Sequence, residues 1–420
     1  MLSQESLFAC WNDQCELSSE RFSGLQGHQG VDIKVAKLYL DMQHVGRIPD
    51  AFRLTATEIN QHCGMNLGNF VFRHALRNVL ADLDEYTPVT GAEYKAILEH
   101  EKAESVIISC ANWLGQTARD EAWNLGRSKM VEMADCSVVA FGLGVQASGL
   151  RHDGAVPLGP DTVRLCKVLS ERSANISVRD ELTRRTLEAN GIDNVVTTGC
   201  PSNFLNCDPK LGDKLYARGK ANTLAEWTDV RTAISEVTGG HALSGAIYKS
   251  QLSMMEQTPA FYVVQTPDFV DFLMGDRGKI SAFYRENNPF VGEPNKLTRL
   301  LKSKGLFFTD VDSWMIFCRT CDFSTGMRIH GTMVPLQSGV PAILIAHDSR
   351  TVGLADAMGV PWMSPDDYLD LMPRGPKGVF EAFSEKIQGF DEKRAVLAQI
   401  MVDFLNSNRL TPNASLLALT

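Results

Sequence analysis

Short apolar runs alternate with longer stretches of amphipathic spacing along most of the chain. The runs Ser105–Ser109, Ser137–Phe141 and Val340–Ala346 are rich in valine, isoleucine and leucine, which is typical of strands that are buried on both faces. Residues 160–172 instead have the spacing of a helix. This alternation of strand and helix predicts an α/β protein made of two doubly wound domains that face a cleft.

The same pattern divides the chain. At 420 residues it is too long for one ordinary core, so two domains of roughly 200 residues are expected. The predicted divisions are a flexible, glycine-dotted arm over 1–35, a first domain over 36–205, a linker and excursion over 206–259, a second domain over 260–405 and a tail over 406–420. Apolar residues from Val31 to Met42 have helical spacing, which predicts a helix there.

The stretch from Asp322 to Arg350 predicts a strand, a tight turn, a helix, a second strand and a second polar turn. The helix is expected to begin near Gly331 or Thr332. Pro335 then falls in its first turn, where a missing N–H group costs little. The two strands are parallel, so both polar turns lie at the carboxyl edge of one sheet, where open α/β sheets bind their ligands.

Charged side chains gather on these two turns. Arg328 and His330 come just before the predicted helix, whose free N–H groups and dipole suit a phosphate or carboxylate. The second turn adds His347, Asp348 and Arg350. The alternative is a surface arginine and a histidine that caps a helix. The second cluster on the same edge favours a functional site.

Two more turns carry candidate residues. Arg179 follows the predicted strand Asn175–Val178, and Asp180 beside it is a natural N-cap for the next helix. A cap needs no arginine beside it, so Arg179 is a candidate for anion binding. Asn66 and Asn69 lie in a glycine-containing turn before another helix, which indicates either a ligand contact or an ordinary helix cap.

Composition excludes several classes of protein. The net charge is −9 and no basic stretch stands out, which argues against a nucleic-acid partner. No apolar run approaches the ~20 residues of a membrane span. The N-terminus has neither the basic start nor the apolar core of a signal peptide, so we predict a cytoplasmic protein without an integral membrane segment.

Cysteines and glycines add little chemistry. The ten cysteines are scattered, which is typical of reduced thiols. Cys318 and Cys321 form a C-x-x-C pair at the end of a predicted helix, but no second pair or nearby histidine completes a zinc site. The Gly142-Leu-Gly144 turn lacks the third glycine of a dinucleotide fingerprint, so NAD binding is not expected.

Several of these motifs resemble those of a known family. Met327-Arg-Ile-His-Gly331, then Gly339-Val-Pro-Ala-Ile343 and His347-Asp-Ser-Arg350, look like the C-terminal signature of the polysaccharide pyruvyl transferases. Ile176-Ser-Val-Arg-Asp180 and Gly191–Pro201 resemble a second signature, and the resemblance covers roughly Gly64 to Pro361. Family members often carry Asp where Asn69 stands.

The resemblance implies a fold and a reaction. The fold is two Rossmann-like domains, as in GT-B glycosyltransferases. The reaction transfers pyruvate from phosphoenolpyruvate as a cyclic ketal onto a sugar of a cell-surface or exported glycan, with release of phosphate. The partners are thus phosphoenolpyruvate and a sugar or lipid-linked oligosaccharide, with no metal or other cofactor. The acceptor sugar and any homo-oligomer stay open.

The resemblance also assigns roles to residues. His330 is the first choice for the general acid that protonates the enol carbon. Arg179 and Arg328 hold the carboxylate and phosphate, and the departing phosphate rests on the helix N-terminus at Gly331 and Thr332. His347, Asp348 and Arg350 are candidates for the acceptor or for a base on its hydroxyl. Asn66 and Asn69 remain candidate substrate contacts.

Two alternatives remain open from the sequence. One is a GT-B glycosyltransferase that uses a nucleotide sugar, because its phosphate site would look similar. The other is a non-catalytic relative that binds sugars or partners. The intact Arg328 and His330 argue against the second, because a binding relic needs neither.

Overall fold

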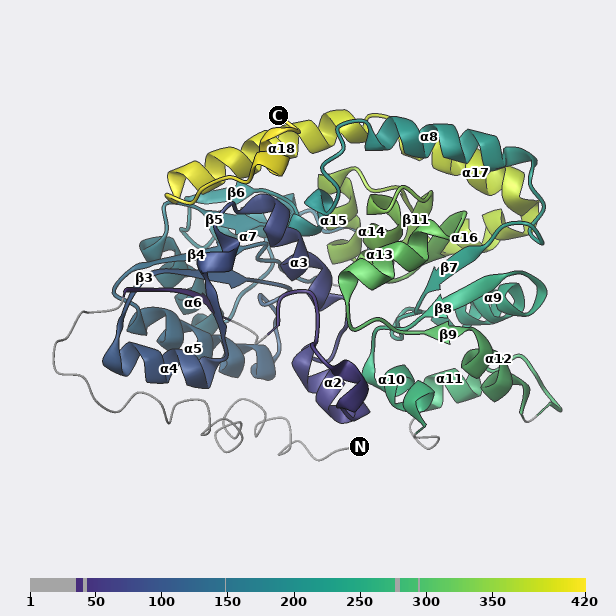
Figure 1. The fold of residues 1–420 in the computed structure, drawn as a ribbon, viewed down its shortest axis with the longest axis horizontal. Coiled ribbons are helices and arrows are strands. Elements are labelled where there is room, and N and C mark those ends of the chain that lie inside the picture. The colour runs from purple at the N-terminus through teal and green to yellow at the C-terminus, as the bar shows by residue number, and fades with distance from the viewer. Residues whose placement is uncertain (1–34, 41–43, 148, 276–279, 294) are drawn as a thin grey trace.

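The computed structural model describes residues 35–40, 44–147, 149–275, 280–293 and 295–420. It has two α/β units side by side, each built on a parallel sheet (Figure 1). The predicted N-terminal arm, apart from Val35, lies outside these residues. No helix in the described ranges is both long and apolar enough to cross a membrane.

The first unit has a four-stranded parallel sheet in the order β2-β1-β3-β4, followed by a two-stranded sheet, β5-β6. Its strands are β1 (Val35–Leu40), β2 (Thr87–Val89), β3 (Lys102–Ser109), β4 (Ser137–Phe141), β5 (Ile176–Val178) and β6 (Val195–Thr197). Its helices are α3 (Asn69–Val79), α4 (Gly91–His100), α5 (Ala118–Met133), α6 (Pro160–Arg172) and α7 (Glu181–Glu188). Helix α2 (Ala56–His62) instead packs against α10 (Pro267–Met274) of the second unit. Short 3-10 helices cover Ala51–Arg53, Leu83–Glu85 and Pro201–Phe204.

The predicted helix over Val31–Met42 is wrong where the structure describes that segment. Residues 35–40 form β1, which pairs with β2 on one side and β3 on the other. Leu38, Tyr39 and Leu40 are buried in succession. A strand inside a covered parallel sheet is apolar on both faces, so its spacing is not the strict alternation that identifies a half-exposed strand.

The second unit has a six-stranded parallel sheet in the order β12-β11-β10-β7-β8-β9. Its strands are β7 (Thr232–Ser235), β8 (Ala260–Val263), β9 (Gly305–Leu306), β10 (Phe323–Gly326), β11 (Ala342–Ile345) and β12 (Trp362–Met363). The remaining helices are α8 (Leu211–Ala221), α9 (Ser244–Gln257), α10 (Pro267–Met274), α11 (Ala282–Glu286), α12 (Lys296–Lys304), α13 (Val311–Arg319), α14 (Ile329–Gln337), α15 (Ser349–Met358), α16 (Pro365–Leu371), α17 (Gly375–Lys386), α18 (Phe390–Ser407) and α19 (Ala414–Leu417). Asn222–Leu224 and Met372–Arg374 are 3-10 helices.

The segment predicted as a linker, 206–259, contains regular structure. It holds α8, β7 and α9, and β7 pairs with β10 and β8 in the middle of the second sheet. The sequence of β7, Thr-Ala-Ile-Ser, has no apolar run although all four residues are buried. Because Thr and Ser interrupt the apolar run, a prediction based on hydrophobicity does not identify this central strand.

The strand order creates a point where the direction of winding changes. The chain runs from β7 outward to β9 and then returns to β10, which lies on the other side of β7. Connections after β7 and β10 therefore leave the sheet in opposite directions and open a crevice at its carboxyl edge. Arg328 follows β10 and Glu236 follows β7, so both belong to this crevice.

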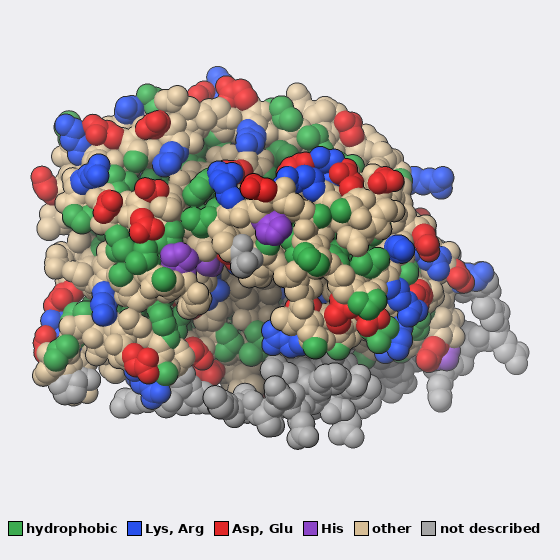
Figure 2. Space-filling model, turned by 180° about the vertical axis from the view of Figure 1, so that it is seen from behind, with side chains coloured by type: hydrophobic (Ala, Val, Ile, Leu, Met, Phe, Trp, Pro, Cys, Tyr) green, Lys and Arg blue, Asp and Glu red, His purple; other side chains and the backbone are tan. Residues whose placement is uncertain are grey.

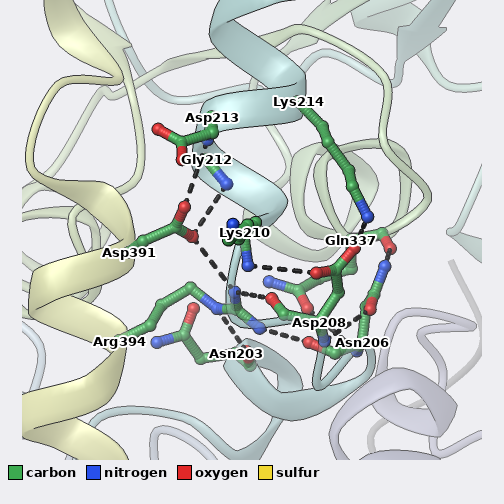
Figure 3. Close-up of polar contacts among 10 residues, drawn as sticks. All are labelled: Asn203, Asn206, Asp208, Lys210, Gly212, Asp213, Lys214, Gln337, Asp391 and Arg394. Carbon is green, nitrogen blue, oxygen red and sulfur yellow. Dashed lines mark hydrogen bonds and ion pairs between the residues drawn. The ribbon is translucent and has the colours of Figure 1, made fainter.

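Helix α18 ties the two units together. It lies along the top of the molecule in Figure 1 and packs against β6 and α15. Its buried Arg394 donates from Nη1 to the carbonyl oxygen of Asp208 at 3.0 Å and also donates to Asn206. Asp391 accepts from the amide of Gly212 at 2.7 Å, as Figure 3 shows. These contacts anchor the segment that leads from the first unit into α8.

The predicted tail, 406–420, packs on the first unit. Pro412 forms a bridge with Leu80, and Leu416 of α19 is buried near α3. Helix α3 also lies between the two units (Figure 1). One face of the first sheet, with Ile107 and Val139, joins the same apolar cluster as α3 and the second unit. The two halves therefore share a continuous core.

Candidate active site

Arg179 enters the site from the end of β5 and is held by backbone oxygens. Its side chain is buried, with Nε donating to the carbonyl of Gly142 at 2.7 Å and Nη2 to the carbonyl of Cys110 at 2.9 Å. Nη1 lies 3.4 Å from Oδ1 of Asn112, and the guanidinium sits over the ring of Phe72. The arginine thus joins the turns after β3 and β4 to the turn after β5.

Arg328 enters from the second unit, after β10. Gly326 at the end of that strand has φ +149°, and a Cβ there would lie 2.2 Å from the carbonyl oxygen of Ser235, so only glycine fits. Nη2 of Arg328 donates to Oε1 of Glu236 at 3.0 Å. The side chain of Arg328 is 21% exposed whereas that of Glu236 is 0% exposed.

His330 is the second residue of α14 and is buried. Its ring packs against Phe72, and its Nε2 lies 3.7 Å from Sγ of Cys200. Burial, together with the positive charges of Arg179 and Arg350, lowers the pKa of His330 to about 3. The imidazole is therefore neutral near neutral pH until an anion offsets these arginines.

His347, Asp348 and Arg350 form the second polar turn. Nε2 of His347 lies 3.0 Å from Oγ1 of Thr238, and burial is the main reason that its pKa falls to about 4. Asp348 caps α15 by accepting from the amide of Thr351 at 2.8 Å. Nη2 of Arg350 lies 3.5 Å from Oδ2 of Asp348. Asp348 thus has a structural role in addition to its place beside the arginine.

These side chains act on one another electrostatically, which places them together. Arg350 lowers the pKa of both histidines, with Arg179 acting on His330 and Arg328 on His347. Burial lowers the pKa of Arg350 itself, and Arg179 and Arg328 lower it further. The face shown in Figure 2 is hollowed near its middle, with histidine side chains beside the hollow. Arginines from both units therefore create one strongly positive site.

The N-terminus of α14 differs from the expectation. The helix begins at Ile329, so Pro335 lies in its interior rather than in its first turn. The amide of Thr332 already donates to the carbonyl of Arg328 at 3.0 Å and has no free N–H to offer a phosphate. A side chain at Gly331 would overlap neighbours at 2.4 and 2.6 Å. The free amides are those of the first turn, residues 329–331.

Asn66 and Asn69 serve the turn that contains them. Oδ1 of Asn66 accepts from the amide of Gly68 at 2.9 Å. Nδ2 of Asn69 donates back to the carbonyl of Cys63 at 3.0 Å. The turn still borders the site, because a Cβ on Gly68 would lie 3.3 Å from Cβ of His330. These contacts favour a local structural role for both asparagines.

Two site residues escaped the sequence pattern. Glu236 belongs to a segment without an apolar run, so nothing in the pattern marked it as the end of a strand. Cys200 lay in a recognised turn, but only the fold brings its thiol to His330. A search for charged residues directly after every short Thr- or Ser-containing strand could have found Glu236.

Metal and thiol chemistry receive no support from the geometry. Within the described ranges, no group of three or more His, Cys, Asp or Glu side chains could hold a metal ion. Cys318 lies in the last turn of α13, as predicted, and burial raises its pKa. A buried thiol at a helix C-terminus is unreactive.

Comparison with known proteins decides the family. A sequence profile described as polysaccharide pyruvyl transferase matches residues 66–349, which is more than half of the chain. The chain belongs to the polysaccharide pyruvyl transferase family. The match begins at Asn66 and ends one residue before Arg350, so it includes Arg179, Arg328 and His330.

Solved structures resemble this pyruvyl transferase family member only distantly. A putative UDP-N-acetylglucosamine 2-epimerase from Listeria monocytogenes is 13% identical, with a TM-score of 0.44 over 90% of this chain and 99% of that one. HepE from Anabaena, in complex with UDP and glucose, is 11% identical, with a TM-score of 0.42 over 89% and 100%. No functionally curated protein matches the sequence. The two doubly wound units follow from the sheet topology itself.

Proposed function

We propose that this protein transfers the pyruvyl group of phosphoenolpyruvate, as a ketal, onto two hydroxyls of a sugar in a cell-surface or exported glycan. The observation that carries the proposal is the convergence of Arg179, Arg328 and Arg350 with two histidines at the junction of the units. Phosphoenolpyruvate carries a carboxylate and a phosphate on a three-carbon frame. Arginine forks suit both groups, since each can take two parallel hydrogen bonds.

The free amides at the start of α14 complete the anion site. They are adjacent to Arg328, which is the N-cap of that helix. A phosphate at this end gains the helix dipole as well as the N–H groups. In the proposed complex the leaving phosphate therefore lies between Arg328 and residues 329–331, and Arg179 faces the donor from the other unit.

His330 supplies the proton in this proposal. The methylene carbon of the enol accepts a proton from His330, and positive charge develops at C2, where the first sugar hydroxyl adds and loses its own proton. Phosphate then leaves C2, and the second hydroxyl closes the ketal with loss of a second proton. Of the two protons that leave the hydroxyls, one restores the proton that His330 gave to the methyl group and the other ends on the departing phosphate, so the proton count balances.

The low pKa of His330 fits this role only when the donor is bound. In the unliganded protein burial, and to a smaller extent the charges of Arg179 and Arg350, lower the pKa and keep the imidazole neutral. A dianionic or trianionic donor offsets Arg179 and Arg350 and so raises the pKa of the histidine. Donor binding and protonation of His330 are thus linked, and the acid is formed only in the complex.

Thermal unfolding with different ligands tests the proposal. Phosphoenolpyruvate at 100 times its dissociation constant should stabilise the fold by roughly 2.7 kcal/mol, and Arg328→Ala should greatly reduce the stabilisation at the same ligand concentration while leaving weaker binding measurable at higher concentrations. UDP-glucose and UDP-N-acetylglucosamine should give no stabilisation. Stabilisation by a nucleotide sugar alone would instead support a glycosyltransferase and refute the proposal. Phosphate release in the presence of glycan fractions then identifies the acceptor.

A further inference from the structure

Glu236 is a buried carboxylate with an unusual number of donors. Its side chain is 0% exposed. Its oxygens accept from the amides of Gln265 at 2.7 Å and Thr266 at 3.1 Å, from the hydroxyl of Thr266, and from Tyr284 Oη at 3.4 Å. Arg328 supplies the fifth contact and the charge. An ionised carboxylate survives burial only with such compensation.

The position of Glu236 follows from the sheet topology. It is the first residue after β7, and β7 lies between β8 and β10. Gln265 and Thr266 follow β8, and Arg328 follows β10. One carboxylate therefore links the connections of three adjacent strands across the crevice.

A second glutamate in the first unit shows what the same arrangement looks like without an arginine. Glu121 accepts from the amides of Asp161 at 2.9 Å and Thr162 at 3.2 Å, and from the hydroxyl of Thr162. It thus caps α6, whereas Glu236 binds the amides of Gln265 and Thr266, the two residues just before α10. No lysine or arginine of the described chain forms an ion pair with Glu121. Capping a helix from a distant glutamate therefore needs no arginine, and the contact with Arg328 has a separate purpose.

We propose that Glu236 is a positioning residue that fixes Arg328 for the donor anion, an inference that rests on the proposed function. Glu236 is fully buried and cannot touch the donor itself. It holds Nη2 of Arg328 and leaves Nη1 for the donor, while Nε is buried. Because the arginine is ordered before the donor arrives, binding does not have to immobilise a flexible side chain.

Calorimetric titration with phosphoenolpyruvate tests this inference. Glu236→Gln keeps the shape of the side chain but loses the charge, and it should raise the dissociation constant roughly tenfold, the equivalent of one newly immobilised side chain. The matched control Glu121→Gln loses a carboxylate that also binds two consecutive amides and a threonine hydroxyl, and it should leave the dissociation constant unchanged. Thermal unfolding of both variants checks that they are folded.

A double variant separates positioning from a general effect on the fold. If Glu236 acts through Arg328, Glu236→Gln should weaken binding in the wild type but have no further effect in an Arg328→Ala background. An equal loss in both backgrounds, or a Glu236→Gln variant that binds like Glu121→Gln, overturns the inference and leaves the proposed function intact. Absence of binding by the wild type overturns both.

A second substitution covers the case in which Glu236→Gln does not fold. Glu236→Asp keeps the charge and shortens the side chain by one methylene group, so its carboxylate no longer reaches Arg328 and the amides of Gln265 and Thr266 at once. Its dissociation constant for phosphoenolpyruvate should rise as well. Wild-type affinity in a folded Glu236→Asp variant contradicts the inference.

Discussion

Arg179 and Arg328 enter the same site from different units and are held by different chemistry. Arg179 is buried among neutral acceptors, the carbonyls of Cys110 and Gly142 and the amide of Asn112. Arg328 is more exposed and is paired with the carboxylate of Glu236. Among the described residues no ion pair with Arg179 is found, whereas Arg328 is paired with a carboxylate before any ligand binds.

The two arginines therefore differ in how far the fold depends on them. Arg179 connects the turns after three strands of the first unit, so this unit depends on it even without a ligand. Arg328 lies between β10 and α14, and a single residue, Glu236, fixes its orientation. Changes at Arg179 should therefore affect both stability and activity, and changes at Arg328 mainly activity.

The largest effect is expected for Arg179→Ala. It removes a buried cation and leaves two buried carbonyls without a donor, so the free energy of unfolding should fall by about 3 kcal/mol, and activity should be lost. Urea denaturation measures this change. Arg164→Ala, which breaks an exposed pair with Glu132, is the control and should cost less than about 1 kcal/mol. If Arg179→Ala and Arg164→Ala lower the free energy of unfolding equally, Arg179 does not help to hold the first unit together.

Arg328→Lys should separate activity from stability. Lysine keeps a positive charge beside Glu236 but has no planar fork for a carboxylate or phosphate. Affinity for phosphoenolpyruvate should fall about 10- to 100-fold while the free energy of unfolding changes by less than about 1 kcal/mol. Calorimetry and urea denaturation provide the two measurements. If Arg328→Lys loses stability but keeps its affinity for phosphoenolpyruvate, Arg328 serves mainly the fold, and the proposed difference between the two arginines is wrong.

His330→Gln should change how stability depends on pH. The pKa of His330 is about 3 in the folded protein and lies near 6.5 in the unfolded chain, so the unfolded chain binds more protons between these values. Stability is therefore complete above pH 6.5 and is lost as the pH falls through this window. The wild type should show a slope up to about 1.4 kcal/mol per pH unit steeper than the variant.

Denaturation at several pH values between 4 and 6.5 measures this slope. His100→Gln, at an exposed position at the end of α4, is the control and should keep the slope of the wild type. Identical slopes for the wild type and His330→Gln would mean that the histidine is not held neutral between the arginines.

The smallest effect is expected for Cys200→Ser. The thiol lies 3.7 Å from Nε2 of His330, and a thiol forms only a weak hydrogen bond. The rate of phosphate release should fall by less than about tenfold, since a hydroxyl can take the same place. A loss of several hundredfold would show that the thiol of the first unit takes part in the chemistry of His330.

The sequence predicted the candidate site best where an arginine follows the end of a predicted strand. Arg179 and Arg350 follow predicted strands with apolar residues, and Arg328 follows the predicted strand at the start of the Asp322–Arg350 stretch, whose sequence in the structure is Phe-Ser-Thr-Gly. The rule that ligands bind at the carboxyl edge therefore predicted that the three arginines lie together. Helix α6 and strand β4 also have the predicted bounds, because their apolar spacing is strong.

The sequence predicted the secondary structure least well in buried strands whose residues do not follow the expected hydrophobic pattern. Strand β7 is fully buried, but half of its residues are Thr and Ser, so the hydrophobic pattern does not predict it. Glu236 is therefore not recognised as the residue that follows a strand. Strand β1 was assigned to a helix because an inner strand has no strict alternation. The helix expected to begin near Gly331 or Thr332 begins at Ile329, so Pro335 lies inside it, two residues before its last residue.

The central claim is that the arginines of both units bind one donor. A double-mutant cycle with Arg179→Lys, Arg328→Lys and the combined variant tests it by calorimetric titration with phosphoenolpyruvate. If both side chains hold the same anion, their effects on the binding free energy should be non-additive by at least about 0.5 kcal/mol. Strictly additive effects, or a wild type that does not bind phosphoenolpyruvate, would contradict the claim.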